Sequence, residues 1–253
     1  MPRVNLTQRG ALRVPEVTIY FWIVKALSTA MGESTSDFMV HRFSPVAAVL
    51  MGFVAFAIAL AIQFFVGRYI AWTYWFAVAM VGVFGTMAAD VLHVGFHVAY
   101  PVSSCLYAAL LVAVFVTWQR TEKTLSIHTI DSVRRELFYW AAVVTTFAMG
   151  TALGDLTAYT FHMGYFASGL VFAAVILIPA IGFRVLHWNA IFSFWFAYVA
   201  TRPFGASFAD WMGKSHADRG LGWGSGSVGL ALALAILALV TYLGVTRRDV
   251  QTQ

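Results

Sequence analysis

The sequence of 253 residues is poor in cysteine and in charge, with one cysteine, Cys105, and 11% charged residues. A single cysteine excludes an internal disulfide framework and any cysteine-rich metal or iron–sulfur site. The excess of five basic residues is spread singly over short segments, so nucleic acid is not an expected partner. The sequence also lacks a Gly-rich nucleotide loop, a hydrolase elbow and a His-Glu-x-x-His motif, and it therefore does not predict an enzyme.

Hydrophobic residues are abundant and make up 60% of the chain. Several apolar runs are about twenty residues long, enough to cross a bilayer core of roughly 30 Å. The sequence therefore predicts an all-α integral membrane protein, with residues 1–253 forming one transmembrane domain in contact with lipid. The eight expected helices span residues 15–38, 45–67, 70–94, 102–119, 137–160, 165–185, 189–213 and 227–246.

The basic residues predict the orientation of these helices. One long polar connector, "QRTEKTLSIHTIDSVRRE", divides the chain into two halves of four helices. Because the number of helices is even, both termini lie on one side. Eleven Lys and Arg residues fall on that side, against three (Arg42, Lys214 and Arg219) on the other. Since cytoplasmic loops carry the excess of positive charge, both termini are predicted to be cytoplasmic.

A fourfold internal repeat runs through the chain. Each copy has a Trp, then Gly after nine residues, then Asp after four more. The copies are Trp22-Gly32-Asp37, Trp75-Gly85-Asp90, Trp140-Gly150-Asp155 and Trp195-Gly205-Asp210. They define two-helix units over residues 15–67, 70–119, 137–185 and 189–246, all in one orientation and arranged with pseudo-fourfold symmetry or as two halves.

The shared orientation predicts a depth for each element of the repeat. The four tryptophans are expected near the cytoplasmic interface, as an aromatic belt. The four aspartates lie about 22 Å further along the helices, in the outer half of the membrane. The glycines are expected to let neighbouring helices approach closely.

These features resemble a family of bacterial membrane-anchored proteins of unknown function. Its members have four tandem repeats, each with two transmembrane segments and a characteristic Trp. The stretches "VTIYFWIVKALSTAMGESTSDF", "TLSIHTIDSVRRELFYW", "FAMGTALGDL" and "TRPFGASFADW" carry the resemblance. It implies a multi-pass protein of the bacterial inner membrane and brings no activity with it.

The predicted helices contain an excess of negative charge. Five acidic residues (Glu33, Asp37, Asp90, Asp155 and Asp210) stand against Lys25 and Arg202, so full ionisation leaves a net charge of −5 + 2 = −3. Isolated charges inside a bilayer cost several kcal/mol. Either protons or a bound cation must therefore compensate these acids.

Histidines follow the repeat aspartates closely, and five of the seven lie within seven residues of one. Carboxylate and imidazole ligands without thiolate suit Mn²⁺, Fe²⁺, Zn²⁺ or Co²⁺. The predicted metal ligands are Glu33, Asp37, Asp90, His93 and His97. Asp155, Asp210, Lys25 and Arg202 are assigned proton or counter-ion roles. Lys25 precedes Glu33 by eight residues and Arg202 precedes Asp210 by eight, about two helical turns.

The function predicted from these residues is proton-coupled transport or export of a cation, with a divalent transition metal such as manganese as the favoured cargo. No resident cofactor is required. A channel with a ring of aspartates is a close relative of this hypothesis. The alternatives are a redox protein with haem held by His93, His97 or His162, and a structural protein whose acids only fix helix packing. A homo-oligomer is compatible with each of them.

Overall fold

The computed structural model describes residues 11–251, with the side chain of Val94 excepted, and this part of the chain is helical without strands. Eight long helices are present, close to the ranges expected. They are α1 (Ile19–Arg42), α2 (Pro45–Val66), α3 (Ala71–Asp90), α4 (Tyr100–Glu122), α5 (Val133–Asp155), α6 (Tyr165–Val185), α7 (Ala190–Gly213) and α8 (Ser225–Thr246). Short π-helical turns, η1 (Val91–Gly95) and η3 (Leu156–Thr160), follow α3 and α5, and 3₁₀ turns η2 (Ile127–Thr129) and η4 (His216–Asp218) lie in loops.

Local sequence signals set several of these helix ends. The side chains of Ser44, Ser132 and Asn189 accept hydrogen bonds from backbone N–H groups in the first turns of α2, α5 and α7. Pro45 occupies the first position of α2, where its missing N–H costs nothing. Gly67 ends α2 in the left-handed region at φ 65°, a conformation that glycine adopts freely.

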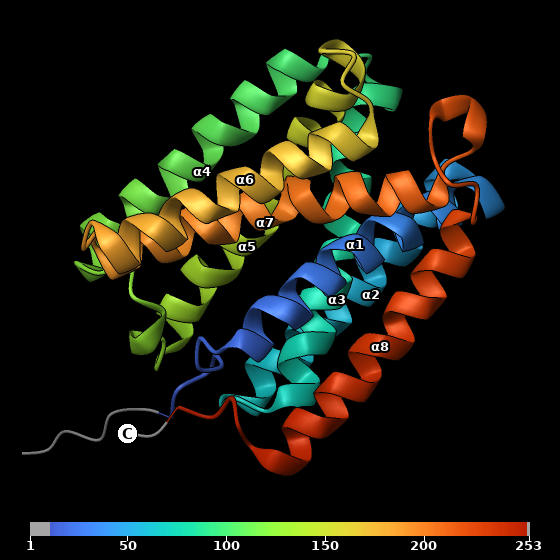
Figure 1. The fold of residues 1–253 in the computed structure, drawn as a ribbon. Helices are drawn as coiled ribbons and strands as arrows, with labels where there is room; N and C mark the ends of the chain where they lie inside the picture. The colour runs from blue at the N-terminus through green and yellow to red at the C-terminus, as the bar shows by residue number, and fades with distance from the viewer. Residues whose placement is uncertain (1–10, 252–253) are drawn as a thin grey trace, which may run out of the picture.

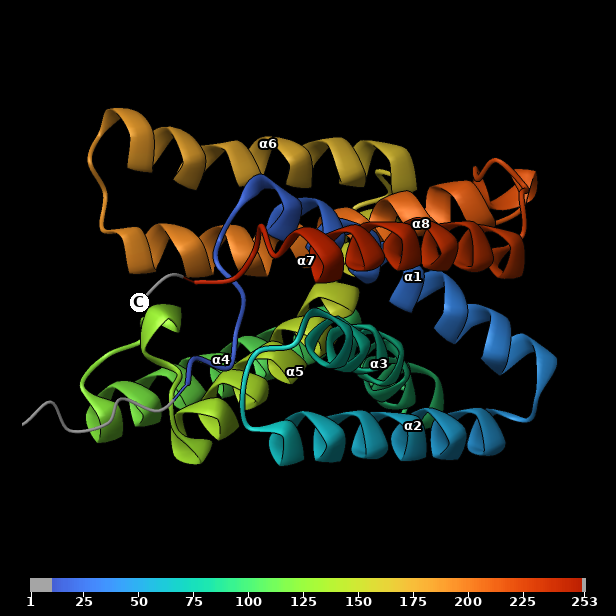
Figure 2. The same cartoon turned by 90° about the horizontal axis from the view of Figure 1, so that it is seen from below.

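The four odd-numbered helices form a closed inner ring. In this ring α1 contacts α3, α3 contacts α5, α5 contacts α7, and α7 contacts α1 again. The even-numbered helices lie outside it, with α2 packed on α3, α4 on α5, α6 on α7 and α8 on α1 (Figures 1 and 2). Each outer helix thus packs mainly on the inner helix of the next repeat, and the last one closes on the first. The arrangement follows the pseudo-fourfold alternative.

The repeat glycines lie where neighbouring inner helices approach most closely. A Cβ added to Gly32 of α1 would lie 2.7 Å from the carbonyl carbon of Gly82 in α3. One added to Gly150 of α5 would lie 2.1 Å from Cγ of Arg202 in α7. Gly85 and Gly205 face the next inner helix in the same way. The expected close-packing role of these glycines is confirmed.

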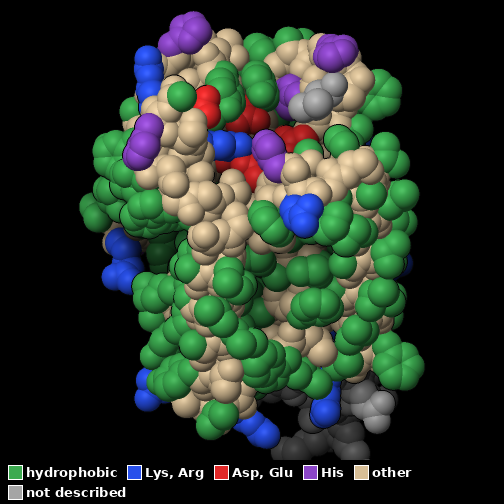
Figure 3. All heavy atoms as spheres, turned by 90° about the vertical axis from the view of Figure 1, so that its right-hand side faces the viewer, with side chains coloured by type: hydrophobic (Ala, Val, Ile, Leu, Met, Phe, Trp, Pro, Cys, Tyr) green, Lys and Arg blue, Asp and Glu red, His purple; other side chains and the backbone are tan. Residues whose placement is uncertain are grey.

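Within residues 11–251, six helices are long and apolar enough to cross a membrane: α2, α3, α4, α5, α6 and α8. The two others, α1 and α7, belong to the inner ring and carry the basic residues Lys25 and Arg202 in addition to acidic residues. Large hydrophobic side chains remain exposed on the outer helices, as at Phe53 of α2 and Phe183 of α6, and Figure 3 shows such side chains over most of one face. The chain therefore has the surface and the helices of a membrane protein, and eight spans remain a prediction.

The ends of the described chain meet at one end of the bundle. The backbone N–H of Tyr69 donates to Leu12 O at 2.9 Å, that of Arg13 to Ile130 O at 3.0 Å, and that of Glu16 to Asp249 O at 2.8 Å. The segment before α1, the α2–α3 and α4–α5 loops and the tail after α8 therefore share one face. The basic residues expected there include Arg3 and Arg9, which lie outside the described residues.

The repeat tryptophans are not exposed, so they do not form a lipid-facing aromatic belt, while their depth near the cytoplasmic interface stays a prediction. Trp75, Trp140 and Trp195 are buried, with at most 5% of the side chain exposed, and Trp22 is partly buried. They pack against other aromatic rings, and Trp195 Nε1 donates to Leu125 O at 2.9 Å. Each repeat Trp lies on an inner helix, which the outer helices shield from lipid.

Candidate functional site

Equivalent repeat positions form layers inside the ring, because the four inner helices share one register. Nearly all of these side chains are buried. Each layer is defined by its offset from the repeat Trp. The first layer, one residue before the Trp, consists of Phe21, Tyr74, Tyr139 and Phe194. The second, three residues after it, consists of Lys25, Val78, Val143 and Tyr198, and the third, seven residues after it, consists of Thr29, Gly82, Phe147 and Arg202. The fourth, eleven residues after it, consists of Glu33, Thr86, Thr151 and Ala206, and the fifth, fifteen residues after it, consists of the four aspartates.

Arg202 forms hydrogen bonds with the three other inner helices within its own layer. Its Nη1 donates to Thr29 O at 2.7 Å, its Nε to Phe147 O at 3.3 Å and its Nη2 to Gly82 O at 3.4 Å. These three acceptors are the positions equivalent to Arg202 in the other repeats. The guanidinium carbon also lies 4.2 Å from the centre of the Phe147 ring. A single buried cation thus connects all four inner helices.

Glu33 lies in the layer between Arg202 and the aspartates, and it is the carboxylate partner of Arg202. Its Oε2 accepts hydrogen bonds from Thr86 and Thr151, each at 3.1 Å, and lies 3.6 Å from Nη2 of Arg202. The spacing of eight residues places Asp210 on the same face of α7 as Arg202, but residues 11–251 contain no ion pair between the two. Closure of the ring instead brings Glu33 of α1 near the guanidinium.

Lys25 lies on the side of the Arg202 layer that is away from the aspartates. Its Nζ is 4.1 Å from the ring centres of Phe147 and of Tyr198, and it makes no hydrogen bond within residues 11–251. Within residues 11–251 Lys25 therefore forms no ion pair with Glu33. The spacing of eight residues places them on one face of α1, but the Arg202 layer stands between them.

The four repeat aspartates line one cavity of about 580 Å³, together with Glu33. Their predicted convergence is confirmed. In Figure 3 a hollow near one end of the molecule contains both acidic and basic side chains and opens to the surface. Apolar and aromatic residues of α2, α3, η3 and α4 complete its walls. The cavity lies at the end of the bundle opposite the described ends of the chain, because the aspartates lie near the C-terminal ends of the inner helices.

Lys214 is the functional residue that the sequence interpretation placed only in a loop. Its Nζ is ion-paired with Asp37 and lies 3.7 Å from Oδ1 of Asp210. Burial alone would lower the pKa of Lys214, but the carboxylates of Asp210 and Asp37 raise it above its ordinary range. Lys214 follows Trp195 by nineteen residues, and the equivalent residues His41 and Tyr159 line the same cavity. This repeat position could have identified it.

Asp90 and Asp155 form the other side of the aspartate ring. Each is the last residue of its α-helix and is followed by a π-helical turn, whereas α1 and α7 continue past their aspartates. Within residues 11–251 neither carboxylate has a Lys, Arg or His partner. The ring of aspartates therefore has two different halves: Asp37 and Asp210 share the single charge of Lys214, and Asp90 and Asp155 have no basic partner within residues 11–251. The π-helical turns recur at functional sites of other proteins.

Of the five predicted metal ligands, Glu33, Asp37 and Asp90 line the acidic cavity, and His93 and His97 do not. His93 Nδ1 is 2.7 Å from Val98 O and its Nε2 is 3.0 Å from Ser103 Oγ, so both ring nitrogens are engaged. His97 is exposed, at φ 54° beyond the π turn. No three His, Cys, Asp or Glu side chains of the described chain are placed to hold one ion. The expected face of Asp90, His93 and His97 requires a continuous α-helix, which the π turn interrupts.

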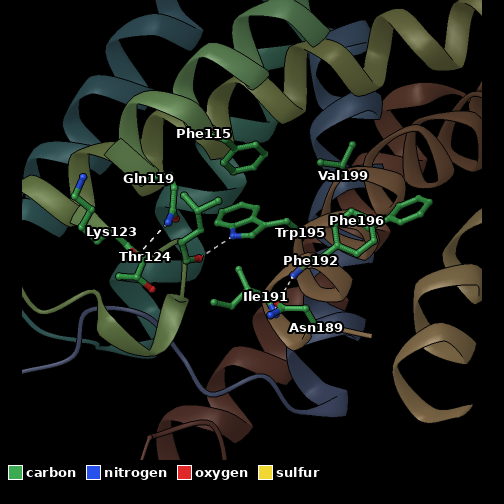
Figure 4. A pocket seen from close by; sticks show the side chains of 11 residues that line it. Phe115, Gln119, Lys123, Thr124, Asn189, Ile191, Phe192, Trp195, Phe196 and Val199 are labelled. Carbon is green, nitrogen blue, oxygen red and sulfur yellow. Dashed lines mark hydrogen bonds between the residues drawn. The ribbon is translucent and has the colours of Figure 1, made fainter. Parts of the chain in front are cut away.

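A second cavity, of about 730 Å³, lies between the end of α4 and the start of α7 (Figure 4). Phe115, Phe192 and Phe196 give it an apolar wall, and Lys123 and Asn189 lie at its polar edge. Its lining contains one cation and no acid among the described residues. It therefore does not suit a cation, and the acidic cavity is the candidate functional site.

Comparison with known proteins gives one finding. The sequence model of a family described as Repeat of Unknown Function (DUF347) matches the chain four times, over residues 20–69, 73–124, 138–184 and 193–249. These matches follow the four repeats of the sequence. No curated protein and no solved structure matches the chain.

Proposed function

Because the chain belongs to the DUF347 repeat family, whose description assigns no activity, we propose a function from the site itself: a membrane transporter that exchanges a cation for protons through the acidic cavity. The observation that carries the proposal is the charge of the cavity and the layer beneath it. Five carboxylates face two cations, Lys214 and Arg202, so full ionisation leaves −5 + 2 = −3. Such an excess in a poorly hydrated site is compensated by bound cation or by protons, and the two compete.

The closed layers beneath the cavity support a transporter over an open channel. Arg202 fills its layer, Lys25 and Tyr198 fill the next, and Tyr74 and Tyr139 hydrogen-bond to each other through their hydroxyls in the layer after that. Access to the cavity is therefore from one end in this conformation. Release to the other end requires these layers to separate, as in alternating access.

The alternatives identified from the sequence are less well supported by the site. A purely structural role accounts for Glu33, which Arg202 holds, but not for Asp90 and Asp155, which face the cavity without a basic partner. A haem protein requires free imidazole nitrogens that face a buried haem. Both nitrogens of His93 are hydrogen-bonded, and His97 and His162 are exposed beyond the two π-helical turns. A divalent metal such as manganese, the cargo favoured by the sequence, remains one class of cation to test.

The proposal is tested in proteoliposomes that enclose a pH-sensitive dye. Mn²⁺, K⁺ and benzyltrimethylammonium are added outside in turn, and at least one should drive protons out of the vesicle. We expect Asp90→Asn and Asp155→Asn each to reduce that flux about tenfold or more, because each removes a charged ligand. Asp218→Asn, at an exposed loop carboxylate outside the cavity, should retain the flux. Absence of coupled flux with all three cations would refute the function.

A further inference from the structure

We propose that the acidic cavity binds an organic ammonium ion with an apolar or aromatic body, and not a bare metal ion. This inference rests on the proposed cation transport and names its class of substrate. It is carried by the size of the cavity, its mixed lining, the ammonium already present in it and an unused carboxylate oxygen at its base.

The size of the cavity and the spacing of its donors favour a molecule over an ion. A metal site needs several donor atoms within about 2.0–2.6 Å of one point. No three donor residues of the described chain converge in that way, although five carboxylates line the cavity. Its volume of about 580 Å³ instead lies within the range of roughly 300–1,000 Å³ that is typical of small-molecule pockets.

The lining has an apolar side as well as an acidic one. Val46, Val49 and Leu50 of α2 face the cavity. Tyr100 and Tyr159 also line it, and their rings lie nearly parallel, with centres 6.0 Å apart and planes 8° apart. A hydrated inorganic ion gains nothing from such walls. The aliphatic or aromatic body of an amine buries apolar surface against them, and its charged group gains from the aromatic faces.

Lys214 shows which cationic group these aspartates accept. Its primary ammonium lies between Asp37 and Asp210 in the same cavity. Asp90 and Asp155 occupy the equivalent positions of the two other inner helices and have no basic partner within the described chain. Asp90 and Asp155 could therefore bind the ammonium group of a substrate as Asp37 and Asp210 bind that of Lys214.

Glu33 supplies an unused acceptor at the base of the cavity. The residue is 4% exposed, and its hydrogen bonds from Thr86 and Thr151 and its contact with Arg202 all involve Oε2. Its Oε1 has no hydrogen-bond donor in residues 11–251, although Glu33 lines the cavity. This oxygen is free to accept a hydrogen bond from a molecule in the cavity, and an N–H donor of a bound ammonium would form a charge-assisted hydrogen bond with it.

The test is isothermal titration calorimetry on the full-length protein purified in detergent. The probes are 2-phenylethylammonium, its neutral isostere 2-phenylethanol, and Mn²⁺. We expect the ammonium to bind and the alcohol to bind at least about tenfold more weakly, because the alcohol lacks the charge. Asp90→Asn and Asp155→Asn should each weaken ammonium binding by about tenfold or more. Asp218→Asn is the matched control and should bind like the unmodified protein.

The outcomes separate this inference from the function on which it rests. Equal binding of ammonium and alcohol, or ammonium binding that is unchanged in both cavity variants, would overturn the inference. Binding of Mn²⁺ alone, lost in Asp90→Asn, would overturn it as well and leave cation transport standing. If none of the three probes binds and no cation drives proton flux in vesicles, both proposals fail. Melting curves of each variant establish that it is folded.

Discussion

At the scale of single residues, Arg202 and Glu33 connect the packing of the ring with the charge of the cavity. Arg202 is fully buried and donates to backbone carbonyls of α1, α3 and α5, while Glu33 forms the base of the cavity. Removing one member of a buried ion pair leaves the other charge without a partner, which costs about 3–5 kcal/mol. The pair should therefore be needed for stability as well as for separating the cavity from the opposite end.

We expect Arg202→Met to lower the melting temperature in detergent by roughly 6 to 20 °C, from the loss of about 3–5 kcal/mol in a protein of this size. Adding Glu33→Gln should restore part of the loss, since it removes the carboxylate left without a partner. Differential scanning fluorimetry of both variants measures the effect. Arg134→Met is the control, because Arg134 pairs with Glu122 at the surface with 69% of its side chain exposed, and it should change little. A melting temperature of Arg202→Met equal to that of the control would contradict the central role of Arg202.

At the scale of helices, α5 carries both a glycine that the packing requires and one that it does not. A Cβ on Gly150 would lie 2.1 Å from Cγ of Arg202 and 3.1 Å from the nitrogen of Pro203. One on Gly154, a single turn further, would have its nearest neighbour, Ser207 Oγ, at 3.6 Å, an ordinary contact. The same substitution at these two positions therefore separates close helix packing from helix propensity.

Gly150→Ala should destabilise the protein by about 1–3 kcal/mol, because the added methyl group forces α5 and α7 apart. Gly154→Ala should be neutral or should stabilise by up to about 1 kcal/mol, because alanine favours a helix over glycine. Thermal unfolding of the two variants in the same detergent measures the difference. Equal melting temperatures would show that α5 and α7 do not approach each other as closely as in this structure.

At the scale of the whole molecule, closure of the ring separates two ends of different chemistry. One end gathers the described ends of the chain and the α2–α3 and α4–α5 loops, and the other holds the acidic cavity and the α7–α8 loop. The distribution of basic residues predicts that the first end is cytoplasmic. The cavity would then open to the outer side in this conformation.

This orientation can be tested with single cysteines in a Cys105→Ser background. A cysteine introduced by Ala217→Cys, in the α7–α8 loop, should react with a membrane-impermeant maleimide added to intact cells. One introduced by Lys123→Cys, at the start of the α4–α5 loop, should react only after the membrane is permeabilised. Both positions are exposed, so access to the reagent depends on the side of the membrane. The reverse pattern would place the cavity on the cytoplasmic side.

The sequence by itself determined the helices, the fourfold repeat and the convergence of the aspartates. These properties depend on local spacing, because fixed offsets of Trp, Gly and Asp on parallel helices place equivalent residues at one depth. The glycine contacts follow from the same periodicity. The position of each repeat residue along its helix was therefore predictable, and so was the acidic character of the cavity.

Only the tertiary structure decided which charges meet. The pairing of Arg202 with Glu33 depends on contact between α7 and α1, which are joined by closure of the whole ring. Lys214 reaches Asp37 because α7 ends at Gly213 beside the far end of α1. His93 turns away from Asp90 because a π turn replaces the expected α-helix, and it binds Val98 and Ser103 instead. Partners across helices and a local change of helix type are not encoded in the spacing of residues along one helix.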